Sequence, residues 1–183
     1  DKEQGTLYYS ARVILDNDLS LSPAYAVPEP LASAPAYSRT VTDVYDNILF
    51  HGKNLQGITA ISACCPAGLL ATAVGAPAPD KWIANPMRKR WLMDPLALDV
   101  AFQLAIVWCY ENAGQVSLPI SFEQFRLYRE SFPSDGIQIV LEVTGKTSHK
   151  MTGNFTFLDA DKAVIAQMVG YQAIMDKSLA ATF

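Results

Sequence analysis

The sequence predicts an α+β fold in which a curved antiparallel sheet wraps around one long apolar helix. Residues 95–110 are apolar almost throughout, and Asp99 is the only charged residue among them. Three strand-like segments precede this stretch and four follow it. The gaps between the last three segments are short and polar, which favours antiparallel connections over helical crossovers.

The long helix is predicted to begin after Asp94 and to end near Gly114. Asp94 followed by Pro95 suits an N-cap and a first helical residue, because the carboxylate accepts free backbone N–H groups and proline gives up no needed donor. Glycine suits the left-handed residue that ends a helix. A helix without a polar face is expected to be buried by other elements, and this one is shorter than the ~20 apolar residues that span a membrane.

The other elements follow from local composition. Residues 6–15 are rich in β-branched and aromatic residues and predict a strand, whereas residues 16–40 hold four prolines and few charges and predict a linker arm. We therefore divide the chain into an arm, 1–40, and a globular domain, 41–183. In that domain we expect a short helix or turn at 41–50, a loop at 77–90 and strands at 57–65, 68–75, 118–128, 137–144, 151–158 and 163–175. A sheet that covers most sides of one helix has the shape of a hotdog fold.

Composition limits the classes of function. Half of the 183 residues are hydrophobic, which suits one domain with a sizeable core. The net charge of −4 predicts no nucleic-acid partner. Cys64, Cys65 and Cys109 show no zinc-binding spacing and are interpreted as reduced thiols. Together with the lack of signal-peptide features, these thiols predict a cytoplasmic location.

Asp99 and Gln103 are the first candidates for a functional site. A carboxylate in a buried helix must find hydrogen-bond donors, shift its pKa or face a cavity. Gln103 lies one turn later on the same face, so the two side chains point to one place. A buried polar network that only fixes packing, or an Asp99 that faces solvent, would explain this pair equally well.

Two segments together resemble a known family. Residues 45–57, YDNILFHGKNLQG, are followed about 35 residues later by DPLALDVAFQ at 94–103. The combination resembles the second hotdog half of polyketide synthase dehydratase domains and the similar regions of polyunsaturated fatty acid synthases. The family's helix motif is His-Pro, three residues, Asp, three residues, Gln, and Asp94 stands where His is usual. In the upstream motif, Tyr-Gly-Pro-x-Phe-Gln-Gly, His51, Lys53 and Leu55 replace Tyr, Pro and Phe.

The resemblance implies dehydration of a 3-hydroxyacyl thioester on the phosphopantetheine arm of an acyl carrier protein, with no further cofactor and no metal. In this family a His removes the α-proton and an Asp protonates the leaving hydroxyl, which assigns Asp99 as general acid and Gln103 as the residue that orients Asp99 or the hydroxyl. Burial raises the pKa of a carboxyl group, as a general acid at neutral pH requires. The implied partners are the carrier protein, neighbouring synthase domains and a second hotdog half or a second copy of the chain.

The base is where the chain departs from the family. The family's His lies in the first half, in the motif His, three residues, Gly, four residues, Pro, and neither His51 nor His149 matches it. His51 is retained as a candidate base within the chain, beside its interpretation as a turn residue. The cations of 88–90 are candidates for carrier-protein docking, beside a solvated loop. Two further hypotheses stay open: a non-catalytic dehydratase-like module for structure, dimerisation or docking, and a stand-alone hotdog thioesterase.

Overall fold

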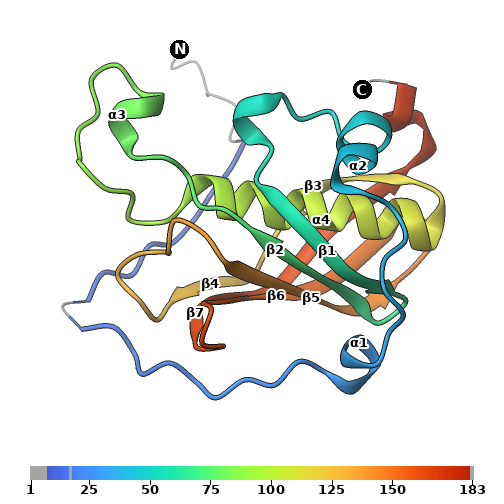
Figure 1. The fold of residues 1–183 in the computed structure, drawn as a ribbon, viewed down its shortest axis with the longest axis horizontal. Coiled ribbons are helices and arrows are strands. Elements are labelled where there is room, and N and C mark those ends of the chain that lie inside the picture. The colour runs from blue at the N-terminus through green and yellow to red at the C-terminus, as the bar shows by residue number, and fades with distance from the viewer. Residues whose placement is uncertain (1–7, 17, 182–183) are drawn as a thin grey trace, which may run out of the picture.

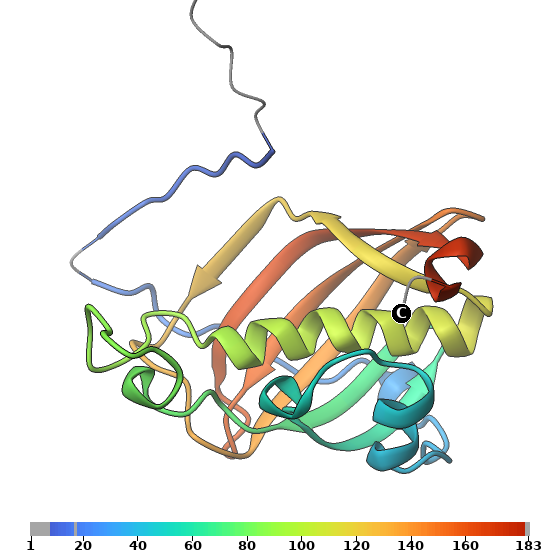
Figure 2. The same cartoon turned by 90° about the horizontal axis from the view of Figure 1, so that it is seen from above.

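The computed structural model describes residues 8–16 and 18–181. In this part of the chain a seven-stranded antiparallel sheet lies against one long helix, α4 (Pro95–Ala113), as Figures 1 and 2 show. The strand order is β1-β2-β5-β6-β7-β3, and β4 also pairs with β7. The strands are β1 (Ile58–Cys65), β2 (Gly68–Ala73), β3 (Val116–Ser121), β4 (Gln124–Leu127), β5 (Ile137–Lys146), β6 (Lys150–Leu158) and β7 (Val164–Asp176).

Helix α4 confirms the predicted buried helix and both of its ends. The Asp94 carboxylate accepts a hydrogen bond from the Ala97 amide at 2.8 Å, and Gly114 ends the helix with a φ of 62°. Between these ends most residues of α4 are buried, and the helix runs along one face of the sheet (Figure 2). The smaller elements are α1 (Glu29–Ala32), α2 (Val41–Asn47), η1 (Lys53–Leu55), α3 (Pro79–Trp82) and η2 (Lys177–Ala181).

Asp94 also ties α4 to the end of β2. Both of its carboxylate oxygens accept from the Ala76 amide, at 3.0 and 2.8 Å, in addition to the bond from Ala97. Burial raises the pKa of Asp94, and the backbone amides oppose this shift. Asp94, which stands in place of the family's His, therefore serves as a structural helix cap.

Replacing Asp94 with Ala is expected to lower the free energy of unfolding by about 2–4 kcal/mol, since the helix cap is lost and the Ala76 amide loses its acceptor. Asn keeps one side-chain oxygen that can accept from both amides, so Asp94→Asn is expected to lose less than about 1 kcal/mol. Urea unfolding of the two variants checks this difference. Equal losses in both variants would contradict the capping role.

Two predicted strands differ in the structure. The segment 118–128 is split into β3 and β4, and the register of β3 against β7 shifts between Pro119 and Ser121. Proline has no amide to donate to a ladder, which confines it to edges and irregular positions. The strand predicted at 6–15 is wrong over its described residues, 8–15, which have no regular structure and largely exposed side chains. They pair with no other described strand; residues 6 and 7 lie outside the described range.

Residues 25–31 of the proline-rich arm pack against the sheet on the face opposite α4 (Figure 1). Leu31 is buried there in a cluster with Val140, Leu158 and Val164. The Tyr25 hydroxyl donates to Glu142 at 2.7 Å. Residues 25–31 therefore cover part of the outer face of the sheet, while the division of the chain at residue 40 stays a prediction.

Candidate functional site

Asp99 lies in the second turn of α4, and 30% of its side chain is exposed although most of the helix is buried. Its Oδ2 atom accepts a hydrogen bond from Gln103 Nε2 at 2.7 Å. The other oxygen, Oδ1, accepts none from the described residues. The helix therefore holds one carboxylate oxygen and leaves the other available to a ligand.

Gln103 is completely buried, and all of its hydrogen-bonding groups are occupied. Its Nε2 atom donates to the Leu55 carbonyl at 2.7 Å as well as to Asp99. Its Oε1 atom accepts from the Tyr45 hydroxyl at 2.8 Å. The structure thus brings Asp99 and Gln103 together as predicted. It adds Tyr45 and the Leu55 carbonyl, which sequence reasoning missed although both lie in the segment 45–57.

His51, in the loop after α2, lies close to the Asp99 carboxylate. Its Nε2 atom lies 3.7 Å from Asp99 Oδ2, which is too far for a hydrogen bond. The side chain is only 7% exposed and stacks on the ring of Phe50 with 4.3 Å between the ring centroids. Its Nδ1 atom is buried and makes no hydrogen bond within the described chain. Burial lowers the pKa of His51, and the nearby Asp99 carboxylate opposes this, so the ring is neutral at pH 7.

The lowered pKa of His51 predicts a loss of stability in mild acid. The folded pKa lies below the unfolded value of about 6.5, so the unfolded chain binds more protons than the folded chain as the pH falls. The contribution is complete above about pH 6.5 and declines below it, by at most ~1.4 kcal/mol per pH unit. His51→Gln should therefore show a flatter decline than the wild type between pH 7 and pH 5 in urea unfolding.

His149 provides the matched control, because it is exposed in the turn between β5 and β6, away from Asp99. His149→Gln should keep the wild-type slope. An unchanged slope in His51→Gln would show that the ring does not titrate as its burial requires.

The cations of 88–90 lie exposed in the loop that precedes α4, and Arg90 forms an ion pair with Glu130 at 3.3 Å. Lys53 is exposed on η1.

In the described part of the chain, His, Cys, Asp and Glu side chains form no group of three or more that could hold a metal ion. Among the helices of residues 8–16 and 18–181, none is long and apolar enough to cross a membrane.

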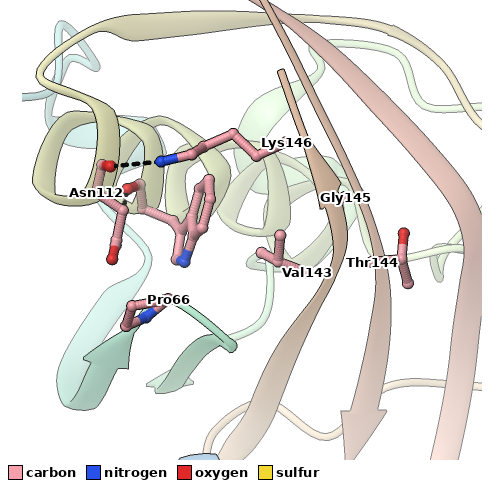
Figure 3. A pocket seen from close by; sticks show the side chains of 7 residues that line it. Pro66, Asn112, Val143, Thr144, Gly145 and Lys146 are labelled. Carbon is pink, nitrogen blue, oxygen red and sulfur yellow. Dashed lines mark hydrogen bonds between the residues drawn. The ribbon is translucent and has the colours of Figure 1, made fainter. Parts of the chain in front are cut away.

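A hollow of about 260 Å³ lies at the other end of α4, between Trp108, Asn112 and Lys146 (Figure 3). The Lys146 ammonium group donates to the Asn112 carbonyl at 2.9 Å and so satisfies an acceptor at the end of the helix. Trp108 is nine residues from Asp99, which is about 13 Å along a helix. This hollow therefore contains none of the candidate residues.

Comparisons with known proteins agree with the geometry. The family model described as the polyketide synthase dehydratase N-terminal domain matches residues 24–177. The chain is 30% identical over 169 residues to a polyunsaturated fatty acid synthase polypeptide of Thraustochytrium sp., a match that covers 86% of this chain and 6% of that protein. The chain therefore spans only a small part of this relative.

Solved dehydratase domains share the fold. A trans-AT polyketide synthase dehydratase domain from Brevibacillus brevis has a TM-score of 0.68 at 19% identity, over 86% of this chain and 55% of that one. The dehydratase domain of a mycocerosic acid synthase-like polyketide synthase has a TM-score of 0.66 at 18% identity, over 90% and 58%. These similarities confirm the predicted hotdog fold, and the family match over 24–177 shows that the chain belongs to the polyketide synthase dehydratase family.

Proposed function

We propose that this chain is the acid-bearing hotdog half of a dehydratase within a polyketide or polyunsaturated fatty acid synthase. The observation that carries the proposal is the Asp99 carboxylate, which is partly exposed on an otherwise apolar, buried helix and is held at one oxygen by Gln103. Burying a charged group in such a helix is costly unless the group has a partner or reaches water. Here the partner engages only one of the two oxygens.

The proposed substrate is a 3-hydroxyacyl thioester carried on the phosphopantetheine arm of an acyl carrier protein. A base removes the proton from Cα. The electron pair of the broken Cα–H bond forms the second bond between Cα and Cβ while the Cβ–O bond breaks. Asp99, protonated on Oδ1, gives that proton to the leaving hydroxyl, and water departs. The hydrogen bond from Gln103 to Oδ2 directs the other oxygen towards the substrate.

The place of the chain in a complete dehydratase is part of the proposal. The description of the matching family model names an N-terminal domain, whereas the Asp-bearing motif at 94–103 resembles the second half. We favour the second half, because the Asp and not the His of the pair is present. The chain spans 55% and 58% of the two solved domains, as one of two halves would. The base then comes from the first half.

The surface near the site supports a covering partner. Phe50, whose ring stacks on His51, is 47% exposed, and Leu55, whose carbonyl binds Gln103, is 38% exposed. Exposed apolar side chains beside a functional group suit an interface with another hotdog half. For the carrier protein we propose the exposed cations of 88–90 and Lys53 as docking groups, since clustered cations attract acidic partners.

A second function is favoured by Asp94, which stands where the family's helix motif has His and serves as a helix cap. In that case the chain is a non-catalytic dehydratase-like module that serves structure, dimerisation or carrier docking in the same synthase. A third possibility is that His51 is the base within this chain, because its neutral ring lies 3.7 Å from Asp99.

One assay separates these possibilities. Mass spectrometry follows the loss of water from a 3-hydroxyacyl thioester on carrier protein, with this chain alone, with the parent polypeptide, and with each carrying His51→Gln or the control His149→Gln. We expect turnover by the parent polypeptide only, unaffected by either substitution. Turnover by the chain alone that His51→Gln abolishes would make His51 the base. No turnover by the folded parent polypeptide would overturn the enzyme proposal and leave the non-catalytic module.

A further inference from the structure

We infer that Tyr45 is a positioning residue of the dehydration site, which acts on Asp99 through the amide of Gln103. This inference rests on the proposed function, because it assigns Tyr45 a part in the same reaction. Tyr45 lies on α2, 54 residues before Asp99 in the sequence, and only 9% of it is exposed. Its hydroxyl donates to Gln103, and Gln103 in turn donates to Asp99, so Gln103 joins the two.

The direction of the hydrogen bond from Tyr45 is fixed by its neighbours. The Tyr45 oxygen accepts the Ile58 amide proton at 3.0 Å, at the start of β1. Its own proton then points to Gln103 Oε1, 2.8 Å away, which can only accept. Burial raises the pKa of Tyr45 to about 12, so the hydroxyl keeps this proton at physiological pH.

The orientation of the Gln103 amide follows from the same network. Its nitrogen faces two acceptors, the Leu55 carbonyl and the Asp99 carboxylate, and its oxygen faces the one donor, Tyr45. A reversed amide would place three acceptor oxygens together and a donor against Tyr45. Four elements, α2, β1, η1 and α4, therefore determine where the Gln103 nitrogen holds the Asp99 oxygen.

Removing the Tyr45 hydroxyl removes one of the hydrogen bonds that hold the Gln103 amide in place. In Tyr45→Phe, Gln103 Oε1 and the Ile58 amide both lose their partner in a buried place, and the Gln103 side chain shifts or takes up water to replace it. Asp99 then keeps its chemistry but loses its fixed position. Small misplacements of a reacting group cost about tenfold or more in rate. We expect kcat to fall about tenfold with KM unchanged, because Tyr45 is not placed in contact with the substrate.

Tyr171 offers a matched control, since it is also a buried tyrosine but its hydroxyl has no hydrogen-bond partner among the described residues. The experiment measures kcat and KM for dehydration by the parent polypeptide with Tyr45→Phe, Tyr171→Phe and Asp99→Asn. In parallel, NMR of this chain records the side-chain amide protons of Gln103. Tyr45→Phe should lower kcat and speed the exchange of these protons with solvent, and Tyr171→Phe should change neither.

The outcomes separate this inference from the proposed function. If Asp99→Asn abolishes turnover while Tyr45→Phe keeps the wild-type kcat, the positioning role is wrong and the proposed function stands. Unchanged exchange of the Gln103 amide protons in Tyr45→Phe also overturns it. If Asp99→Asn keeps full activity, the proposed function fails, and the role of Tyr45 in it fails too.

Discussion

Asp99→Asn in the parent polypeptide is expected to slow dehydration about a thousandfold, in the range by which a positioned general acid accelerates a reaction. Asn has nearly the same shape as Asp but no acidic proton to give to the leaving hydroxyl. Its side-chain oxygen can still accept the Gln103 amide proton that Oδ2 accepts in the wild type. The network around Gln103 should therefore persist, and the midpoint of thermal unfolding should move by less than about 3 °C.

The measurement is the rate of unsaturated thioester formation, with thermal unfolding of the same samples. Asp80→Asn is the matched control, because Asp80 is an exposed acid on α3 and has no place in the site. It should keep the wild-type rate. Full activity in Asp99→Asn would remove Asp99 from the mechanism, and a large drop in the unfolding midpoint would mean that the carboxylate is needed for the fold instead.

The parts of the fold that depend on neighbours in the sequence could be predicted. Asp94, Pro95 and Gly114 set the ends of α4 through contacts within a few residues, and the structure places both ends as expected. The short polar gaps at 145–148 and 159–162 likewise predict antiparallel pairing, and β5 pairs with β6 and β6 with β7 in this way. The hotdog architecture followed from these local patterns, since an apolar helix needs a sheet to cover it.

The parts that depend on distant neighbours could not be predicted in the same way. Spacing on a helix placed Asp99 beside Gln103, but exposure is decided by what covers the helix, and the carboxylate proved partly exposed. Tyr45 meets Gln103 across 58 residues, and no periodicity in the sequence indicates that contact. Residues 8–15 have the composition of a strand, yet composition does not supply a neighbouring strand to pair with.

Gly68→Ala is expected to destabilise the fold strongly. Strands at 57–65 and 68–75 were predicted, but the close approach of β5 to the start of β2 was not. Gly68 has a φ of 152°, and a Cβ atom there would clash with the Leu141 carbonyl oxygen. That oxygen belongs to the backbone of β5, which pairs with β2 at this point, so no side-chain movement relieves the clash. Leu31 of the arm lies against the same position, 3.2 Å from the added atom.

We expect Gly68→Ala to lower the free energy of unfolding by about 4 kcal/mol, from backbone strain and from the separation of β2 and β5. For a domain of this size the midpoint of thermal unfolding should fall by about 8–16 °C. Gly52→Ala is the control, because nothing lies within 4 Å of a Cβ atom there and its φ of −65° suits alanine. Urea and thermal unfolding of both variants make the comparison. If Gly68→Ala unfolds like Gly52→Ala, the β2–β5 contact at the turn is looser than the structure shows.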